Sequence, residues 1–358
     1  MTLPSRNRPA LLAWLLLCAA LVALMVLIGG YTRLSGSGLS ITSWKPVHGI
    51  IPPLNAGQWQ EEFDAYRQSP QYIKVNRGMQ LEEFKAIFWP EFIHRLLGRV
   101  IGAVFFLPLI VFALRRSFNR RFGWRLAGIF ALGGLQGIIG WMMVRSGLQD
   151  DPQVSPVYLA AHLAVAFGIL GMILWAGMDV LTSPSPNWGE GRGGGLPGRL
   201  SPVIPLPNPP PCRGRGLYLP WFSLLCLQII LGALMAGLHG GLIYNTWPTM
   251  DGHWIPDELL AASPWYANVA LVQFMHRTLA VFLAVSYLAM WLYNPKTRPH
   301  NLIAATLAAQ FALGVATLLH QAPLALALAH QMTGLLLFSL SVIALHRSCE
   351  SLATPQNS

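Results

Sequence analysis

Eight long apolar stretches constrain the fold of this chain more than any other feature of its sequence. They lie near residues 10–31, 93–114, 124–144, 157–181, 217–237, 268–292, 301–320 and 326–346. Each is long enough to cross a bilayer as a helix, and none has the two-residue alternation of a barrel strand. Of the 358 residues, 54% are hydrophobic and 11% are charged, which is typical of a membrane protein. We therefore predict an all-α integral membrane protein with eight transmembrane helices.

The positions of Arg and Lys between these stretches predict the orientation of the chain. Clusters occur before the first stretch and after the second, fourth, sixth and eighth, all on one side of the membrane. Because cytoplasmic loops carry an excess of Lys and Arg, we expect both termini to be cytoplasmic. The first stretch has no convincing cleavage site and is interpreted as a retained helix. The net charge of +10 reflects this asymmetry, so it does not indicate a nucleic-acid partner.

A segment rich in Pro and Gly, residues 182–216, divides the chain into two parts with four apolar stretches each. It has no periodic apolar face, which predicts a disordered cytoplasmic linker. We therefore expect an N-terminal half, residues 1–181, and a C-terminal half, residues 217–358.

The two halves contain matching motifs. "GLSITSWKP" follows the first stretch and "GLIYNTWP" follows the fifth, while the second stretch opens with "EFIHRLLGRVIGAV" and the sixth with "QFMHRTLAVFLAV". "LQGIIG" in the third stretch corresponds to "AQFALG" in the seventh, and "YLAAHLAVAFG" in the fourth to "ALALAHQMTG" in the eighth. This repeat predicts two four-helix bundles related by a pseudo-twofold along the membrane normal.

One histidine recurs near the outer end of the second, fourth, sixth and eighth stretches: His94, His162, His276 and His330. Within each half the two histidines can face each other across the bundle interior. Neutral imidazole is a metal ligand, and a pair from facing helices can hold a heme with both axial positions filled. No CxxCH motif for covalent heme attachment occurs. The pattern therefore predicts axial ligation of heme iron by these four residues.

Small residues and arginines flank these histidines. Arg95 and Arg277 directly follow two of them and could pair with heme propionates through forked hydrogen bonds, or extend to lipid phosphates instead. Four positions after each histidine, one helical turn deeper, a small residue leaves space for a flat macrocycle. These small residues are Gly98, Ala166, Ala280 and Gly334.

The halves differ at Glu91, three residues before His94, whose counterpart in the C-terminal half is Gln273. An acid one turn from an axial ligand can stabilise positive charge, orient water or take a proton. It can equally be a carboxylate near a helix N-terminus, favoured there by the helix dipole. The first outer loop, roughly residues 31–90, is also much longer than its counterpart. We therefore predict chemistry in the N-terminal half and a permanently bound heme in the C-terminal half.

These motifs resemble the heme A synthase family over all eight stretches, and the resemblance depends most on "GGYTRLSGSGLSITSWKPVHGIIPP" and "EEFKAIFWPEFIHRLLGR". It implies oxidation of the C8 methyl group of heme O to a formyl group by successive hydroxylations, which gives heme A. It also implies that His94 and His162 ligate the substrate heme, that His276 and His330 ligate heme b, and that Glu91 is catalytic. Some members have a cysteine pair in the first outer loop, which is absent here, as in the proteobacterial and mitochondrial branch.

The resemblance further implies a location in the bacterial inner (plasma) membrane, surrounded by lipid, with the heme sites near the periplasmic side. Heme O synthase and cytochrome oxidase assembly are the implied partners, while the electron donor and any homo-oligomer stay open. Two other functions fit the residues. One is a diheme b-type cytochrome that transfers electrons from quinol without modifying heme, although Glu91 and the long first loop fit it less well. The other is a transporter whose histidines relay protons.

Overall fold

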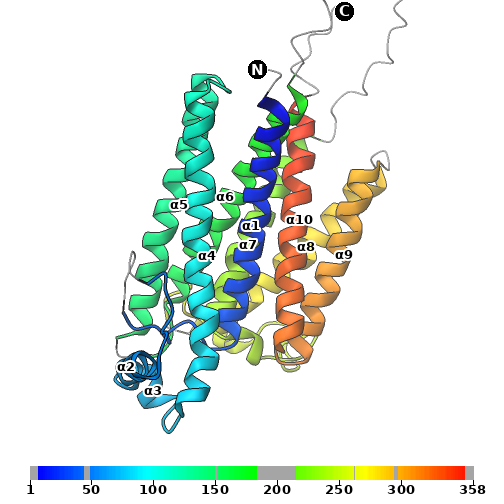
Figure 1. Cartoon of the computed structure of the whole chain (residues 1–358). Helices are drawn as coiled ribbons and strands as arrows, with labels where there is room; N and C mark the ends of the chain where they lie inside the picture. The colour runs from blue at the N-terminus through cyan, green and yellow to red at the C-terminus, as the bar shows by residue number, and fades with distance from the viewer. Residues whose placement is uncertain are drawn as a thin grey trace, which may run out of the picture.

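The computed structural model describes residues 7–43, 49–149, 151–183, 215–261, 263–293 and 297–350. Within these residues, eight helices are long and apolar enough to span a bilayer, which confirms the predicted all-α membrane fold. Figure 1 shows them side by side, with the start of the first and the end of the last at the same end of the bundle. They are α1 (Arg8–Leu34), α4 (Leu81–Leu114), α5 (Arg120–Gly147), α6 (Pro156–Thr182), α7 (Arg215–Gly237), α8 (Val269–Tyr293), α9 (Arg298–Leu319) and α10 (Leu324–Glu350).

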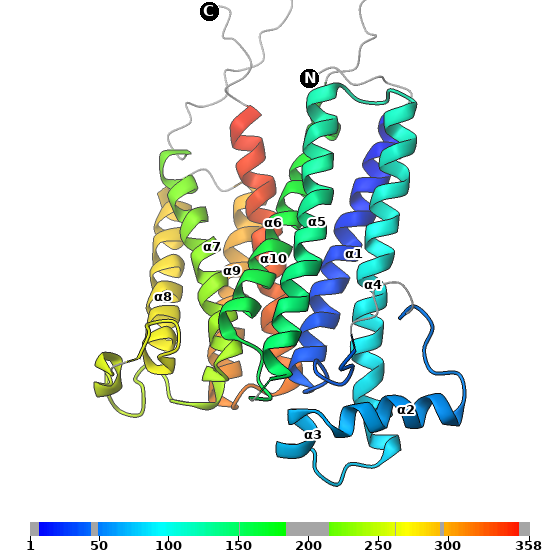
Figure 2. The ribbon, with the colours of Figure 1, turned by 90° about the vertical axis from the view of Figure 1, so that its left-hand side faces the viewer.

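The two halves meet along their central helices. In the N-terminal half α1 packs against α4 and α6, and α6 packs against α5. The seam between the halves is formed by contacts of α6 with α7 and α10, and of α1 with α10 (Figure 2). One apolar core crosses this seam, since buried Trp14, Phe167 and Phe338 belong to the same cluster. The pseudo-twofold relation between the halves stays a prediction.

The long first outer loop contains two short helices, α2 (Ala56–Arg67) and α3 (Pro70–Lys74). They pack on an extension of α4, which begins at Leu81 rather than near residue 93 as the apolar stretch suggested. This extension is amphipathic, so a hydropathy window misses it, but a capping box between Gln80 and Glu83 starts the helix. The rings of Tyr66 and Phe84 stack at 5.1 Å between α2 and α4. The end of the bundle where α2 and α3 lie is called the outer end below.

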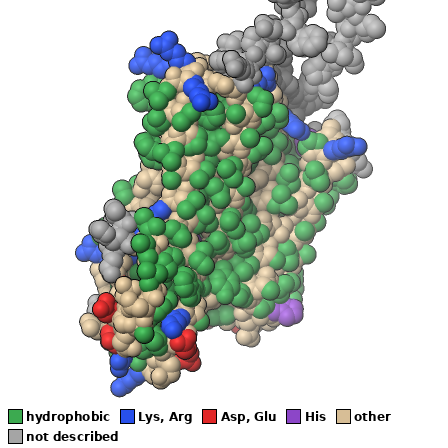
Figure 3. Space-filling view, in the orientation of Figure 1, with side chains coloured by type: hydrophobic (Ala, Val, Ile, Leu, Met, Phe, Trp, Pro, Cys, Tyr) green, Lys and Arg blue, Asp and Glu red, His purple; other side chains and the backbone are tan. Residues whose placement is uncertain are grey.

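The surface agrees with a membrane-spanning bundle. Figure 3 shows apolar side chains along the length of the helices, with Lys and Arg at the end where α1 begins. The visible Asp and Glu side chains gather at the outer end, together with further Lys and Arg. The loop between α7 and α8 also lies at the outer end and contains two short 3-10 helices, η2 (Gly240–Leu242) and η3 (Asp257–Leu260).

The predicted linker lies almost entirely outside the described residues. Thr182 still belongs to α6 and Arg215 already belongs to α7, so the ends of the predicted segment 182–216 overlap two helices. Residues 184–214 between them are not described.

Candidate functional site

The two predicted ligands of the N-terminal half each pack against a glycine of a neighbouring helix. His94 of α4 lies against Gly29 of α1, where a Cβ would be 3.0 Å from Nε2 of the imidazole. His162 of α6 lies against Gly140 of α5, where a Cβ would be 2.9 Å from Cε1. Because real Cβ atoms essentially never come closer than 3.0 Å, a larger residue at Gly140 would displace the ring. His94 and His162 also lie near each other, so the structure brings the predicted pair together.

The C-terminal half repeats this arrangement. His276 of α8 lies against Gly232 of α7, where a Cβ would be 3.1 Å from Cε1. His330 of α10 lies against Gly314 of α9, where that distance would be 2.9 Å. His276 and His330 also lie near each other. Each half thus holds a pair of histidines, and each histidine ring lies against a glycine of a neighbouring helix. We call these the glycine-seated pairs.

In two of these four contacts, a glutamine one turn before the glycine donates a hydrogen bond to the backbone carbonyl of the histidine. Nε2 of Gln136 donates to the carbonyl oxygen of His162 at 3.0 Å. Nε2 of Gln228 donates to the carbonyl oxygen of His276 at 3.0 Å and lies 3.1 Å from its ring Nδ1. These bonds fix the helix register beside each ring, as interhelical polar contacts do in membranes.

At the other two histidines, His330 and His94, the residue one turn before the glycine behaves differently. In α9, Nε2 of Gln310 lies 3.4 Å from Nε2 of His330. In α1 the residue one turn before Gly29 is Met25, which offers no amide. Sequence reasoning missed the glutamines, although the spacing in "LQGIIG", "LQIILG" and "AQFALG" is the signal that could have found them.

Two of the small residues predicted one turn below the histidines, Gly98 and Gly334, lie against the side chains of Met25 and Gln310. A Cβ at Gly98 would be 3.5 Å from Cε of Met25, an ordinary contact. A Cβ at Gly334 would be 3.1 Å from Nε2 of Gln310, which is tight. Small residues here therefore let the partner helix approach, in addition to the space for a macrocycle that the sequence predicted.

The residues of each half fit a heme. All four imidazoles are half-buried. The Nδ1 atoms of His162 and His330 are buried and have no hydrogen-bond partner among the described residues. A zinc ion is held by three or four protein ligands, and no group of three or more His, Cys, Asp or Glu gathers in the described part of the chain. Two imidazoles instead match heme, whose porphyrin supplies the equatorial ligands.

Glu91 is buried and holds the start of the first outer loop. Its Oε2 accepts from Oγ of Ser40 at 2.6 Å and from the backbone N of Ile41 at 2.9 Å, while Oε1 accepts from Nη2 of Arg95 at 2.6 Å. Because α4 begins at Leu81, Glu91 is not in its first turn, so the interpretation as a dipole-favoured N-terminal carboxylate is wrong.

Gln273, the counterpart of Glu91, is also buried and donates from Nε2 to the carbonyl oxygen of Ile243 at 2.9 Å. Both side chains therefore fasten the outer loop that follows the first helix of their half. The carboxylate carries charge and the amide does not, which preserves the asymmetry that the sequence indicated.

The two predicted propionate partners bind outer-loop backbone. Arg95 donates to the carbonyl oxygens of Ser43 at 3.2 Å and Ile41 at 2.9 Å. Arg277 donates to the carbonyl oxygens of Thr246, Thr249 and Tyr244. Its Nε is buried and has no hydrogen-bond partner among the described residues, so one donor of Arg277 stays available. Propionate binding by both residues stays a prediction.

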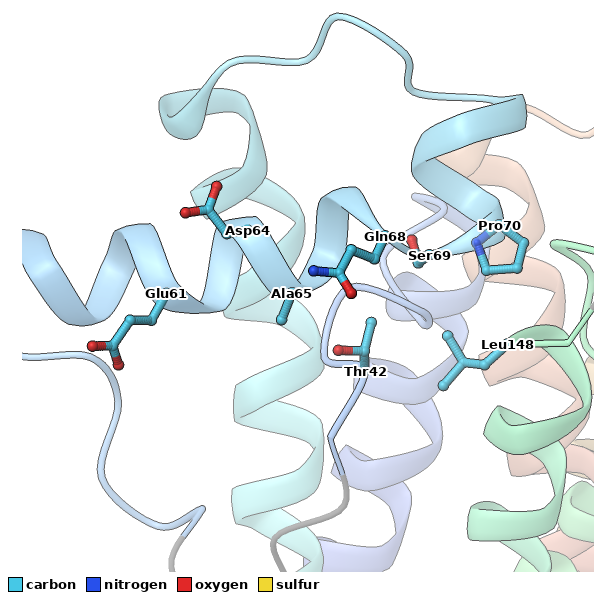
Figure 4. A pocket seen from close by; sticks show the side chains of 8 residues that line it. All are labelled: Thr42, Glu61, Asp64, Ala65, Gln68, Ser69, Pro70 and Leu148. Atoms are coloured by element: carbon cyan, nitrogen blue, oxygen red, sulfur yellow. The ribbon is translucent and has the colours of Figure 1, made fainter.

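An open pocket of about 640 Å³ lies at the outer end, between α2, α3, the loop after α1 and the end of α5 (Figure 4). Glu61 and Asp64 line one side of it, and Leu148 lies across from them. None of the predicted site residues lines it, so the pocket is separate from the histidine pairs.

Comparison with known proteins classifies the chain. Residues 12–342 match the family described as cytochrome oxidase assembly protein (COX15-CtaA). The chain belongs to this family. It is similar to the heme A synthase of Nitrosospira multiformis, with 44% identity over 93% of this chain and 92% of the relative. It is 42% identical to the heme A synthase of Parvibaculum lavamentivorans over 95% of both chains, and 46% identical to that of Methylobacterium radiotolerans over 94% of this chain and 90% of the relative.

Membership in the cytochrome oxidase assembly protein family confirms the resemblance predicted from the outer-loop and histidine motifs. The match extends from α1 to α10, so it includes all four histidines and both glycine-seated pairs. The alternative of a diheme electron carrier is not favoured by relatives that are named heme A synthase.

Proposed function

We propose that this protein is a heme A synthase, which oxidises the C8 methyl group of heme O to a formyl group by successive hydroxylations and releases heme A. The observation that carries the proposal is the pair of neighbouring histidines in each half, within a chain 44% identical to a heme A synthase over nearly its whole length. The enzyme is accordingly an oxidoreductase that acts on a methyl group.

We assign the substrate to the N-terminal half and heme b to the C-terminal half. His94 and His162 would ligate the iron of heme O, and His276 and His330 would ligate the iron of heme b. Bound heme b would supply electron transfer. The assignment is supported by Glu91, a buried carboxylate that has a neutral amide as its counterpart in the other half. Chemistry that develops charge needs this asymmetry, whereas permanent binding does not.

The buried carboxylate can assist the oxidation electrostatically. Its oxygens are held by Ser40, the backbone N of Ile41 and Arg95, so Glu91 does not need to reorganise during the reaction. A fixed anion one turn from His94 stabilises positive charge that develops at the substrate methyl carbon, or receives the proton that is released. Arg95 moderates the charge of the carboxylate. The available Nε of Arg277 would donate to a propionate of heme b.

We place the protein in the bacterial inner membrane, with both termini cytoplasmic and both histidine pairs near the periplasmic side. The excess of Lys and Arg at the end where α1 begins supports this orientation. A heme O synthase must supply the substrate, and cytochrome oxidase assembly must consume the product. The family description, cytochrome oxidase assembly protein, supports the second partner.

Heme extraction tests the proposal. The chain is co-expressed with a heme O synthase in a host that lacks its own heme A synthase, and the extracted hemes are identified by chromatography and mass. We expect heme A and heme b from the wild type. We expect His276→Ala and His330→Ala to lose heme b.

Two results would contradict this function. Heme b without any heme A, in the presence of heme O, would indicate the diheme electron carrier. A purified chain with no heme in its pyridine hemochrome spectrum would indicate a transporter with proton-relay histidines.

A further inference from the structure

A polar link crosses the seam between the two halves beside the histidine pairs. Nε2 of Gln331 in α10 donates to the backbone carbonyl oxygen of Val26 in α1 at 2.6 Å. Gln331 directly follows His330 in the sequence. The link therefore joins the helix that carries His330 to the helix against which His94 packs. We call Gln331, with the Val26 carbonyl and Gly30 beneath it, the amide link.

Gly30 makes room for this link. A Cβ at Gly30 would overlap the Gln331 amide, since it would lie 2.7 Å from Nε2 and 2.8 Å from Cδ. Helical side chains point back over the preceding turn, so a larger residue at Gly30 would also cover the Val26 carbonyl. The preceding residue, Gly29, is the one against which His94 packs. Two consecutive glycines of α1 thus receive Gln331 and His94.

The opposite seam is apolar at the same positions. In the sequence repeat, Leu163 corresponds to Gln331, and Ala233 corresponds to Gly30. Ala233 and Leu163 belong to one apolar cluster between α6 and α7. Packing two bundles together therefore does not require an amide here. A polar side chain within a membrane is costly unless its hydrogen bonds are satisfied, so its presence on one seam indicates a role beyond packing.

We propose that Gln331 is a positioning residue that couples the two histidine pairs through Gly30 and Gly29. The inference depends on the proposed function, in which the C-terminal half holds heme b and the N-terminal half binds heme O. The position of His330 sets the position of the Gln331 amide, which follows it in the sequence. This amide holds α1 at Gly30. The adjacent Gly29 of α1 supports the ring of His94. The substrate pair is therefore correctly placed only when the resident heme pair is in place.

The substitution Gln331→Leu tests the coupling. It copies Leu163, so it keeps apolar packing and removes only the hydrogen bond. The full chain is purified with its hemes, and the low-spin electron paramagnetic resonance signals of the two halves are assigned with His276→Ala. We expect Gln331→Leu to retain both hemes and to shift the signal of the N-terminal half, although the substitution lies in the other half. An unchanged N-terminal signal with both hemes bound overturns the proposal.

The substitution Gly30→Ala approaches the same link from α1. The added methyl group displaces the flexible end of Gln331, so we expect the signal of the C-terminal half to shift. In the double variant with Gln331→Leu, the electron paramagnetic resonance signals should shift no further than in Gln331→Leu alone, because both substitutions remove the same contact. Additive shifts would overturn the coupling. The matched control is Leu163→Ala, which also follows an axial histidine and should change only the signal of its own half.

Hydrogen exchange measures the link without reference to heme. Loss of one hydrogen bond in Gln331→Leu should make residues 26–33 of α1 exchange about two- to tenfold faster. The equivalent segment of α7, residues 229–236, should be unchanged. Equal exchange at residues 26–33 in both proteins overturns the link. If the wild type is purified without heme, the proposed function fails, and this measurement still decides whether the link holds α1.

Discussion

The imidazole of His162 lies directly against Gly140, where a Cβ would be 2.9 Å from its Cε1. A histidine seated in this way has its ring plane set by the backbone of the neighbouring helix. Side chains that orient an axial ligand tune its affinity for the metal as strongly as many direct contacts do. A glycine of a neighbouring helix also lies against each of the other three histidines, and these contacts lead to the first prediction.

Substituting a glycine that lies against one of the histidines should weaken heme binding in that half only. Gly140→Ala displaces His162 and should lower heme affinity in the N-terminal half by about tenfold or more. Gly314→Ala should do the same for His330 in the C-terminal half. Heme stoichiometry and the identity of the extracted heme check both expectations. Gly128→Ala, in α5 with nothing within 4 Å of the new methyl group, is the control and should leave both hemes bound.

Two substitutions of Glu91 should distinguish its structural role from its chemical role. Glu91→Ala removes the buried carboxylate that pairs with Arg95 and accepts from Ser40, and it should destabilise the fold by about 3–5 kcal/mol. Glu91→Gln keeps the acceptor for Ser40 and copies Gln273, so we expect it to fold, to retain heme and to make little heme A. Thermal unfolding and heme chromatography measure the two effects. Normal heme A from Glu91→Gln would make the residue purely structural. Glu82→Gln, an exposed change on the same helix, is the control.

A polar cluster near the other end of the bundle should contribute to stability. Asp179 of α6 accepts from Nη1 of Arg125 at 2.5 Å and from Nε2 of His346 at 2.7 Å, which joins α5, α6 and α10. Because Arg125 is partly exposed, we expect Asp179→Asn to cost only about 1–2 kcal/mol. The midpoint of thermal unfolding in detergent measures this loss. Asp151→Asn at an exposed position should have no effect, and an equal loss in both variants would contradict the prediction.

The outer contact between the halves should weaken in acid. Nε2 of His239 lies 2.9 Å from Nη2 of Arg33, and burial, with a smaller contribution from this guanidinium, lowers the pKa of His239. A histidine with a lowered pKa in the folded state binds its proton more readily when unfolded. Its contribution to stability is therefore complete above about pH 6.5 and falls as the pH drops below that value.

The pH dependence of thermal unfolding between neutral and mildly acidic pH checks this expectation. His239→Asn removes the titration and tolerates the left-handed backbone at this position, where φ is 53°. We expect the wild type to lose more stability on acidification than this variant. Parallel curves would show that His239 does not carry the effect.

Hydropathy predicted the eight spanning helices and the repeat predicted which histidines belong together. These are local properties, because a segment in lipid must satisfy its backbone hydrogen bonds within itself, and apolar length alone then selects a helix. Histidines at equivalent places in helices of matching direction must lie at similar depth. The predicted heme ligand set, including His94 and His330, therefore follows from residue type and spacing. The long start of α4 did not, because its amphipathic turns carry too many charges for a hydropathy window.

The sequence by itself determined the spans, the orientation expected from Lys and Arg, and the four imidazoles of this protein. Only the tertiary structure decided which glycine seats each ring, that Arg95 binds loop carbonyls, and that Gln331 reaches Val26 across the seam. These contacts depend on the rotation of each helix about its axis and on its depth beside a neighbour. Side chains from distant segments fix both quantities together when the helices pack, so no single segment of the sequence encodes them.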